Sequence, residues 1–481
     1  MKKITLFLSI AMLSMTIGTA NAAKKDVKIT DEPWKDVNKV LKRIKAPKFK
    51  ENKTFKITDY GAVNEKEDYN TGAVNKAIDA AAEAGGGVVV VPKGTFYTGP
   101  ITLKSNVKLH LEDGAVLKFS TNPNDYKPAV RTRFEGWDCI NFRPLIYAYN
   151  CKNIGITGNG TLDGQATNEN WWPWKGSAKY GYKPGMKSQE WNGTRENAGR
   201  KKLAKMEADN VPFEQRIMTE DDRLRPSFVE FYNCQNIIMQ GFTLVNSPFW
   251  CLHPIFSTNV TVKGVTVRSH GPNNDGCDPE SCDYVLIEDC LFDTGDDCIA
   301  IKSGKNEDGR RWGKPSKYIV VRNCKMKDGH GGVVLGSEIS GNVKNVWAEN
   351  CEMDSPNLDR VIRAKSNPIR GGVLENFFIR NIKVGVCKEA IFRVEMKYEH
   401  VTEGPNMPEI KNFVIENVTS NKSKYGVWID GIEGNGVKPQ VSNITIRNCS
   451  FDNVQTPYRI AGAENIKFDN VKINGQDTVV K

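Results

Sequence analysis

The chain has 481 residues and a formal net charge of +10, a length that fits two or three ordinary domains or one long repetitive fold. After residue 22 no stretch is apolar for long enough to span a membrane, and the chain has no long Lys/Arg block and no nucleic-acid-binding motif. We therefore expect neither membrane insertion nor a nucleic-acid partner. The basic charge fits another polyanion or serves solubility alone.

The first 22 residues have the pattern of a signal peptide. Lys2 and Lys3 form a positive start, residues 4–17 are apolar, and Ala20-Asn21-Ala22 is a small-x-small cleavage site. We expect export to the periplasm or the extracellular space. Cleavage would remove both lysines and lower the net charge from +10 to +8. Residues 23–50 are then expected to form an N-terminal arm.

Residues 51–481 are expected to form one β-rich catalytic domain that begins with a helix. Residues 71–87, TGAVNKAIDAAAEAGGG, are amphipathic at helical spacing and end in glycines. The strand-like segments VVVVPKGTFYTGPITL and VKLHLEDGAVLKFS follow. Residues 165–226 then interrupt the strands with a segment rich in Trp, Lys, Gly and Asn. Because long inserted loops on repetitive folds usually lie on the functional face, we expect this insertion beside the site.

A repeat with steps of 22–36 residues occupies the second half of the chain. Each copy has two short runs of alternating Ile, Val or Phe, split by Gly, Asn or Asp five residues after an anchor. The anchors are Asn236, Asn259, Tyr284, Tyr318, Asn345, Asn376, Asn412, Asn443 and Asn465. One copy cannot bury its inward side chains alone, but stacked copies can, which predicts an all-β fold, a single-stranded parallel β-helix capped by the 71–87 helix. A propeller needs longer blades of four strands.

The cysteines follow the same repeat. Asn-Cys pairs recur at one place in successive copies, which favours stacked small apolar side chains over disulfides. Cys277 and Cys282 could pair, because export would permit disulfides. No zinc-type spacing occurs, so we expect no metal.

Chemically active side chains recur one coil apart in the second half of the chain. Asp275 is followed 21 residues later by the pair Asp296 and Asp297, and His330 lies one longer coil further on. Arg363 and Lys365 come one coil after that. On a β-helix these positions should form one surface ladder with steps of about 5 Å. Clustered carboxylates separate their pKa values, so that one can act as an acid while others hold a water, as glycoside hydrolysis requires.

The motifs of this ladder resemble those of the polygalacturonases of glycoside hydrolase family 28. The chain has NNDG (273–276), GDD (295–297), GHG (329–331) and RAK (363–365), where the family usually has NTD, (G/Q)DD, GHG and RIK. The resemblance spans about residues 55 to 470. Asn274 replaces Thr and Ala364 replaces Ile, and neither departure changes a charged position. The resemblance implies a right-handed, pectin lyase-like β-helix that needs no cofactor.

The resemblance also implies roles for the ladder in the inverting hydrolysis of α-1,4-linked galacturonic acid. Asp296 stands at the position of the general acid, and Asp275 and Asp297 at the positions that hold the attacking water. His330 would sustain the protonation state of the acid. A spacing of one coil is more typical of a retaining pair than of the roughly 6.5–9.5 Å of inverting pairs, but the family implies inversion.

Four further residues are implied to bind substrate. Arg363 and Lys365 match the pair that binds a galacturonate carboxylate, and Tyr398 falls where the family has a substrate-binding tyrosine. Lys302 would either meet a carboxylate in the pocket or be an exposed structural lysine. Segments such as RPSFVEFYNCQNI and NNDGCDPESC are most similar to bacterial exo-acting members, in which the insertion would close one end of the groove. We expect a monomer that acts on acidic plant cell-wall polysaccharide.

Other interpretations of the same residues stay open. Each motif alone fits a turn or a solvated strand face, and the tryptophans of the insertion could pack it onto the body. The chain could hydrolyse another pectic polymer such as rhamnogalacturonan, or bind polysaccharide without catalysis. A pectate-type lyase would need calcium and a cationic base. If Gly276 took position six of a calcium loop, Gly271 and Cys282 would occupy ligand positions, so that pattern fails.

Overall fold

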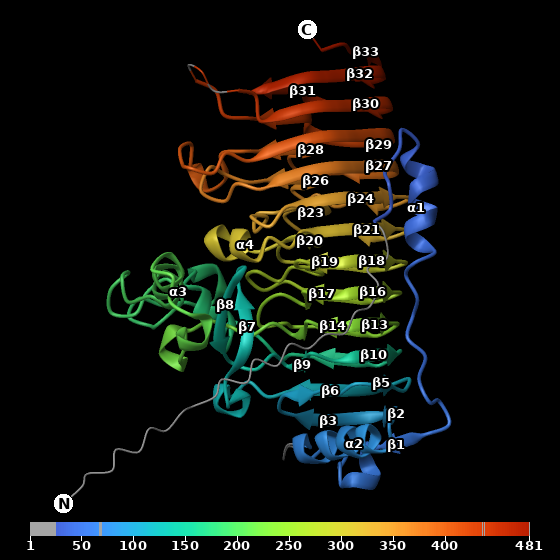
Figure 1. Cartoon of the computed structure of the whole chain (residues 1–481), viewed down its shortest axis with the longest axis vertical. Helices are drawn as coiled ribbons and strands as arrows, with labels where there is room; N and C mark the ends of the chain where they lie inside the picture. Colours follow the sequence, from blue (N-terminus) through green and yellow to red (C-terminus); the bar gives the residue numbers. More distant parts are fainter. Residues whose placement is uncertain (1–25, 67–69, 435, 437, 481) are drawn as a thin grey trace, which may run out of the picture.

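The computed structural model describes residues 26–66, 70–434, 436 and 438–480. The expected signal peptide, residues 1–22, lies outside the described residues, as do residues 23–25 of the expected arm. The described chain winds into a single-stranded right-handed parallel β-helix, seen as a stack of strands in Figure 1. Within these residues no helix combines the length and apolar content needed to cross a membrane.

Three ladders of parallel strands run along the β-helix. The first comprises β1 (Thr54–Lys56), β2 (Gly87–Val91), β5 (Val107–Leu111), β10 (Lys152–Gly158), β13 (Gln235–Gln240), β16 (Thr258–Lys263), β18 (Asp283–Glu288), β21 (Ser316–Arg322), β24 (Val343–Glu349), β27 (Val373–Val386), β29 (Glu409–Asp430), β30 (Val441–Phe451) and β32 (Ala463–Ile473). The second comprises β3 (Gly94–Thr98), β6 (Ala115–Phe119), β11 (Thr161–Asp163), β14 (Thr243–Val245), β17 (Thr266–Ser269), β19 (Leu291–Thr294), β22 (Lys325–Met326) and β25 (Glu352–Met353). The third comprises β4 (Ile101–Thr102), β9 (Ile146–Tyr149), β12 (Val229–Tyr232), β15 (Leu252–Ile255), β20 (Ile299–Ile301), β23 (Val333–Leu335), β26 (Arg360–Lys365), β28 (Ala390–Glu395) and β31 (Val454–Ala461). A hairpin of β7 (Val130–Phe134) and β8 (Trp137–Asn141) stands apart from these ladders, and the terminal β33 (Gln476–Asp477) pairs antiparallel with β32.

Inward-facing aliphatic side chains stack into columns that form the core. In one column Leu109, Ile156, Met239, Val262 and Ile287 are register partners on successive coils. Each is fully buried, and burial of such a side chain contributes about 1.5–3 kcal/mol relative to exposure. The period-two pattern of the sequence therefore becomes a core that is continuous along the axis.

Asparagines at the repeat positions stack into columns along the first ladder. The anchor residues and the residues five positions later adopt positive φ angles, for example 60° at Asn376 and 54° at Asn381. Asn376 Nδ2 donates to Asn345 Oδ1 at 2.8 Å, and Asn381 Nδ2 donates to Asn350 Oδ1 at 2.9 Å. Asparagine tolerates the left-handed conformation better than most residues, and its amide bonds to its copy one coil away.

Helices cover one end and one side of the stack (Figure 1). The expected cap is α2 (Thr71–Glu83), which buries Val74, Ala77, Ile78 and Ala81 against the first coils. It ends before the glycines because Gly85 and Gly86 adopt positive φ angles of 74° and 110°. The arm forms α1 (Pro33–Leu41), a helix that the sequence did not predict. It packs on the first ladder through Val37 and Val40.

The insertion folds into short helical turns beside the third ladder. It contains α3 (Gly199–Ala208), which lies close to α4 (Asn306–Trp312), the helix that follows β20. The short 3-10 helices of the chain are η1 (Ile57–Tyr60), η2 (Pro123–Tyr126), η3 (Trp172–Lys175), η4 (Ala178–Tyr180), η5 (Phe213–Gln215), η6 (Glu220–Asp222) and η7 (Tyr398–His400). Trp171 and Trp174 are buried and pack against Phe142, and Trp171 also packs against Tyr126. These two tryptophans therefore anchor the insertion to the body.

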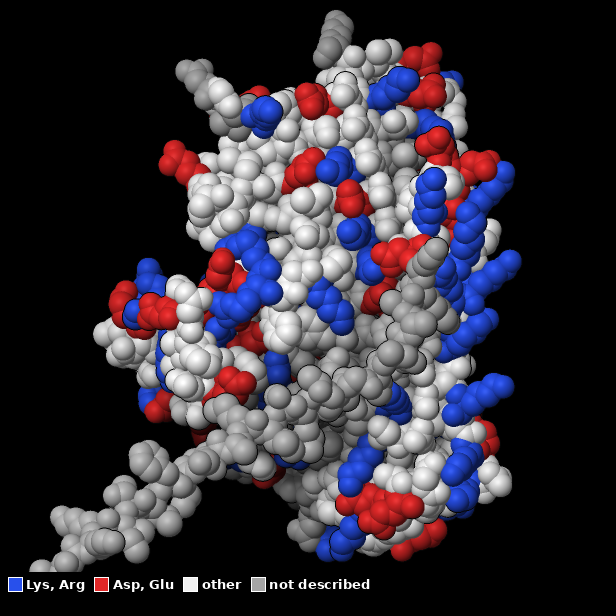
Figure 2. All heavy atoms as spheres, in the orientation of Figure 1, with Lys and Arg blue, Asp and Glu red and all other residues white. Residues whose placement is uncertain are grey.

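Positive side chains gather along one edge of the molecule. Figure 2 shows lysine and arginine side chains along the edge where α1 and the following residues run in Figure 1. Exposed lysines in this segment are Lys42, Lys45, Lys48, Lys50, Lys53 and Lys56. The net positive charge of the chain is thus partly concentrated on the arm.

Candidate active site

Turns at the third ladder bring the four sequence motifs onto neighbouring coils. The Gly276 amide donates to the Asp297 carbonyl at 3.0 Å, and the Cys298 amide donates to the Gly331 carbonyl at 2.8 Å. Val334, shortly after GHG, is the register partner of Arg363. The backbone ladder thus fixes NNDG, GDD, GHG and RAK as successive steps, as the sequence predicts.

Three carboxyl groups meet at this ladder. One oxygen from each of Asp275, Asp296 and Asp297 lies within 4.8 Å of the other two. Asp275 and Asp297 are buried, and Asp296 is partly exposed. Asn274 holds the turn because its Oδ1 accepts from Ser269 Oγ at 2.6 Å and from the Gly271 amide at 2.9 Å. Asparagine therefore fills this position with buried hydrogen bonds.

Cationic groups neutralise the carboxyl cluster. His330 Nδ1 lies 2.9 Å from Asp296 Oδ1, and Lys365 Nζ donates to Asp297 Oδ2 at 2.7 Å. Lys302 Nζ lies 3.5 Å from an oxygen of Asp275. The side chain of Lys302 is only 3% exposed, so it is not the exposed structural lysine that the sequence left open. Each acid of the cluster therefore has a basic group nearby, and Lys302 is shared with Asp278 and Glu338.

Two of the predicted substrate-binding residues lie at the edge of this cluster. Arg363 Nη2 donates to Glu395 Oε2 at 2.8 Å and contacts none of the three aspartates by a hydrogen bond or ion pair in the described chain. The Tyr398 ring lies 5.3 Å from Lys365 Nζ and 5.7 Å from the Arg363 guanidinium. Lys365 and Tyr398 line the pocket that contains the carboxyl cluster, whereas Arg363 stands behind it.

The His330–Asp296 pair carries one proton in a polarised hydrogen bond. The negative charge of Asp296, together with their hydrogen bond, raises the pKa of His330 to about 9. Burial opposes ionisation of Asp296, but the charges of His330, Lys365 and Lys302 outweigh it and lower the pKa of Asp296. In this arrangement the proton of the pair resides on the imidazole, while the sequence-based interpretation expected it on the carboxyl.

Burial shifts the pKa values of two further carboxyl groups, those of Asp275 and Asp278, upward. Burial, followed by the charges of Asp278 and Asp296, raises the pKa of Asp275 well above its ordinary value. Burial likewise raises the pKa of Asp278 to about 8, although the Lys302 charge opposes this. Lys302 Nζ is 3.5 Å from Asp278 Oδ1. Near neutral pH Asp278 therefore favours its protonated form, and burial shifts Asp275 in the same direction.

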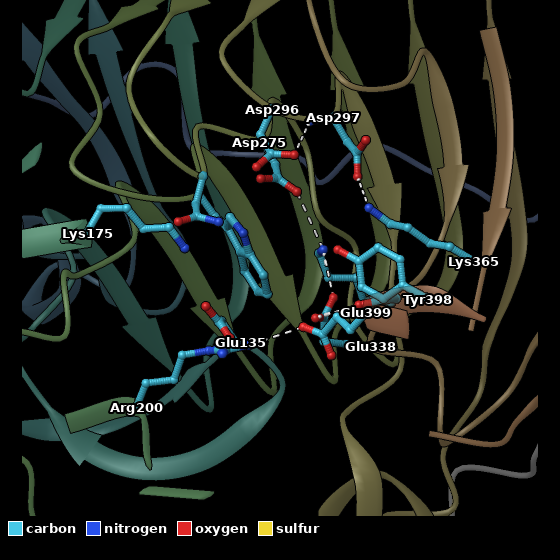
Figure 3. Close-up of a pocket in the computed structure, with 14 residues that line it drawn as sticks. Glu135, Lys175, Arg200, Asp275, Asp296, Asp297, Glu338, Lys365, Tyr398 and Glu399 are labelled. Atoms are coloured by element: carbon cyan, nitrogen blue, oxygen red, sulfur yellow. Dashed lines mark hydrogen bonds and ion pairs between the residues drawn. The ribbon is translucent and has the colours of Figure 1, made fainter. Parts of the chain in front are cut away.

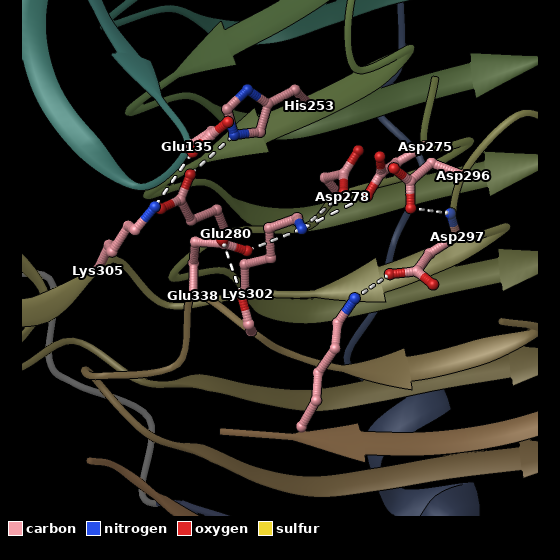
Figure 4. Close-up of polar contacts among 12 residues, drawn as sticks. Glu135, His253, Asp275, Asp278, Glu280, Asp296, Asp297, Lys302, Lys305 and Glu338 are labelled. Carbon is pink, nitrogen blue, oxygen red and sulfur yellow. Dashed lines mark hydrogen bonds and ion pairs between the residues drawn. The ribbon is translucent and has the colours of Figure 1, made fainter. Parts of the chain in front are cut away.

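Buried polar contacts extend from the pocket residues Lys302 and Glu338, and Figure 4 shows them. Lys302 Nζ donates to Glu338 Oε2 at 3.0 Å, and these opposite charges outweigh burial to raise the pKa of the lysine and lower that of the glutamate. His253 Nε2 lies 2.8 Å from Glu280 Oε2, which in turn accepts from Arg133 of β7 through its other oxygen at 3.0 Å. The network ties the β7–β8 hairpin to the third ladder.

The carboxyl cluster has a spacing that a metal ion can use, but its partners argue for proton chemistry. The lysines and the histidine already occupy hydrogen-bonding positions on the three aspartates. A second group, His270, Asp293 and Asp328, also has ligand atoms within 4.8 Å. There Asp328 already accepts hydrogen bonds from Ser355 and Asn357. Each group offers three side chains, whereas calcium takes about six to eight oxygen ligands.

Several residues of the pocket were missed from the sequence. The pocket has a cavity volume of about 120 Å3 and is shown in Figure 3. Its lining adds Glu135, Lys175, Arg200, Trp250, Asn273, Ser337, Glu338 and Glu399 to the predicted residues. Arg200 of α3 lies 2.7 Å from Glu135 of the β7–β8 turn and 3.4 Å from Glu399 of η7. The insertion thus meets two other elements at one end of the pocket.

Comparisons with known proteins agree with this fold. Residues 213–424 match the family model described as Glycosyl hydrolases family 28, and residues 54–125 match one described as Rhamnogalacturonase A/epimerase, pectate lyase-like. A probable polygalacturonase from Vitis vinifera is 29% identical, over 81% of this chain and 73% of that protein. An exo-poly-alpha-D-galacturonosidase from Dickeya chrysanthemi is 26% identical, over 87% of this chain and 74% of that protein.

A solved structure gives the strongest similarity of the three. A hyperthermoactive exopolygalacturonase from Thermotoga maritima superposes with a TM-score of 0.87 and 39% identity, over 92% of this chain and 96% of that chain. The family match covers the four motifs. The chain therefore belongs to glycosyl hydrolase family 28.

Proposed function

We propose that the protein is an exo-acting hydrolase of α-1,4-galacturonosidic bonds in pectin, which it degrades by releasing single galacturonate residues. The observation that carries this proposal is the cluster of Asp275, Asp296 and Asp297, neutralised by two lysines and a histidine at one end of a small pocket. Glycoside hydrolysis needs an acid for the leaving oxygen and carboxylates for a water, and the cluster supplies both.

Asp296 acts as the general acid together with His330. An anionic sugar that enters the pocket raises the pKa of Asp296, because like charge disfavours its ionised form. The proton then passes from His330 Nδ1 to Asp296 Oδ1 across their 2.9 Å contact. Asp296 delivers a proton to the glycosidic oxygen as the bond to the anomeric carbon breaks, and the imidazole serves as its proton reserve.

Asp297 and Asp275 hold the attacking water. Asp297, in its ion pair with Lys365, accepts the proton of the water, and Asp275 orients the water through a hydrogen bond. The two residues flank Asp296 within the same 4.8 Å cluster. Attack by water and not by a carboxylate inverts the anomeric configuration, although the short spacing alone is more typical of retaining pairs.

The shape of the pocket supports exo action. Its volume of about 120 Å3 is below the roughly 300–1,000 Å3 of pockets that hold drug-sized ligands, so it suits one sugar better than a run of sugars. The contacts of Arg200 with Glu135 and Glu399 close the end beside the insertion. We place the released residue in this closed end. The relatives from Dickeya and Thermotoga are exo-acting by name.

The pocket disfavours the lyase alternative. A lyase of the pectate type needs a cationic base, but both Lys302 and Lys365 are bonded to carboxylates. These charges outweigh burial and raise the pKa of each lysine, which makes it a poor base. The match to a rhamnogalacturonase-type model covers residues 54–125, which contain none of the four motifs. A protein that only binds an anionic polysaccharide would not need three clustered acids, which repel such a ligand.

The setting of the reaction is also a proposal. We propose export by the signal peptide at residues 1–22, action as a monomer, and acidic plant cell-wall polysaccharide as the substrate. The basic side chains along the arm fit such a polyanion.

Product analysis on polygalacturonic acid in the presence of a chelator tests the function. Reducing ends, ultraviolet absorbance and product sizes should be followed from the first minutes. Saturated galacturonate alone is the expected product. A ladder of oligomers would retain the hydrolase and reject exo action, and absorbing unsaturated products would establish a lyase. No product would move the search to branched pectic polymers.

A further inference from the structure

The lining of the pocket contains more acids than bases. The acids are Glu135, Asp275, Asp296, Asp297, Glu338 and Glu399, and the bases are Lys175, Arg200, Lys302 and Lys365. A galacturonate residue adds one more negative charge. Burying that carboxylate beside this set is unfavourable unless a cation that is not already committed to a protein acid meets it.

Three of the four bases are already committed. Lys365 is bonded to Asp297 at 2.7 Å, and Lys302 to Glu338 at 3.0 Å. Arg200 Nε donates to Glu135 Oε2 at 2.7 Å. Removing any of these cations from its partner would leave a buried protein carboxylate uncompensated, so none of them is free to neutralise a substrate.

Lys175 is the exception. Its charge helps to lower the pKa of the nearby Glu135, but within the described part of the chain its ammonium forms no hydrogen bond and no ion pair. It is partly buried, and Figure 3 shows its side chain extending from the insertion toward the interior of the pocket. It lines the closed end together with Glu135 and Arg200. A free cation at this end lies where the released sugar would sit.

The backbone that carries Lys175 is held firmly. Lys175 is the last residue of η3 (Trp172–Lys175), and Gly176 follows with a φ of 84°. On the same turn, Trp172 Nε1 donates to the Ser247 carbonyl at 2.9 Å, and Trp174 is buried beneath the Arg223 guanidinium at 4.7 Å. A lysine on a fixed turn can position its ligand, because the backbone that carries it loses little conformational entropy on binding.

We infer that Lys175 recognises the carboxylate of the terminal galacturonate residue and so sets the specificity of the enzyme for an acidic chain end. This inference rests on the proposed function and adds a specificity-determining residue from the insertion. The four sequence motifs supply the chemistry, and the insertion supplies the charge that selects which sugar is released.

The test compares two trisaccharides that differ in one group. One is trigalacturonate, and the other carries galactose in place of galacturonate at the non-reducing end. For the wild type, kcat/KM for release of the terminal residue should favour the acid by roughly 10- to 100-fold, the value of one charge-assisted hydrogen bond. In Lys175→Ala this ratio should fall to near one, and Lys175→Arg should keep most of it. Lys183→Ala, at an exposed position of the same insertion, should match the wild type.

The outcomes distinguish recognition of the substrate carboxylate by Lys175 from a structural role of this residue. A ratio that Lys175→Ala leaves unchanged overturns the inference, and so does an equal fall of activity on both trisaccharides, which would give Lys175 a structural role. If Lys175→Ala fails to fold, Lys175→Gln keeps most of the stem without the charge and carries the same test. A wild type that cleaves neither trisaccharide but acts on another polymer overturns the proposed function and the inference together.

Discussion

Lys365 Nζ lies 2.7 Å from Asp297 Oδ2, although 68 residues separate the two in the chain. Both side chains are almost fully buried, with exposures of 6% and 1%. The pair connects the coil that carries the acids to the coil that carries RAK. It therefore contributes to the fold and to the site at once, and the two contributions can be separated.

Lys365→Met should destabilise the protein by about 3–5 kcal/mol, because it leaves Asp297 buried without its partner. The double variant Lys365→Met/Asp297→Asn should regain most of this stability, since no uncompensated charge remains. Both variants should be inactive. Denaturant unfolding and exo-hydrolysis assays check this, and a double variant as unstable as the single one would contradict the argument.

Asp296→Asn should lower kcat by roughly 10²–10⁴-fold, because a positioned acid contributes about that much. Binding of oligogalacturonate should persist, since the cations of the pocket remain. Calorimetric titration with trigalacturonate measures binding, and reducing-end assays measure turnover. Turnover close to that of the wild type would exclude Asp296 as the acid.

Activity should decline as the pH rises through about 9, where His330 loses its proton. The pKa of His330 is raised above the roughly 6.5 of an unfolded histidine. Its ion pair with Asp296 is therefore fully present below about pH 6.5 and is lost between there and pH 9. His330→Gln should lower the melting temperature relative to wild type at pH 6 and much less at pH 10. A pH-independent difference would argue against a charged pair.

Trp171→Ala should cost about 3–5 kcal/mol, as expected for a fully buried aromatic side chain. Loosening the anchor of the insertion should also open the end of the pocket, so that short oligomers appear beside galacturonate. Trp191, which is 38% exposed, offers a matched control: Trp191→Ala should change stability by less than about 0.5 kcal/mol. Chromatography of early products checks the pattern, and galacturonate alone from a folded Trp171→Ala would show that the wall does not depend on this anchor.

Asn376→Ala should destabilise the fold by about 2 kcal/mol. Alanine is strained at the positive φ of 60° and loses the hydrogen bonds to Asn345 and Asn412. Asn376→Gly should cost about half as much, because glycine accepts the backbone angle and loses only the two hydrogen bonds. Thermal unfolding of the two variants separates the two contributions, and equal losses would mean that the ladder bond dominates.

Much of this architecture could be predicted because, in a β-helix, residues that are one repeat apart in the sequence lie next to each other on successive coils. The anchors from Asn236 to Asn465 define the coils, so residues at equal places in successive copies must be neighbours. The repeat alone placed Asp275, Asp296, Asp297, His330 and Lys365 together. In the structure the three carboxyl groups lie within 4.8 Å of one another, His330 contacts Asp296, and Lys365 contacts Asp297.

The other parts of the fold and of the pocket could not be predicted, because they come from segments that do not repeat. Glu135 comes from a hairpin and Arg200 from the insertion, and nothing in the repeat relates their positions to the acids. Helix α1 is stabilised because Val37 and Val40 pack in one buried cluster with Leu286 and Trp347 of the first ladder. The surface that these two ladder residues form exists only once the coils have stacked. Arg363 lies on the predicted coil, but its partner Glu395 on the next strand could not be seen from the motif.

The closed end of the pocket limits how the enzyme can travel along a polymer. A released sugar has to leave through the opening that the remaining chain occupies, so the chain must withdraw before the next cut. The enzyme would therefore act distributively, and its rate on a fixed mass of pectin would follow the number of chain ends. Its output would rise as other enzymes shorten the polymer, which suits it to the last step of a digestion and not to the first.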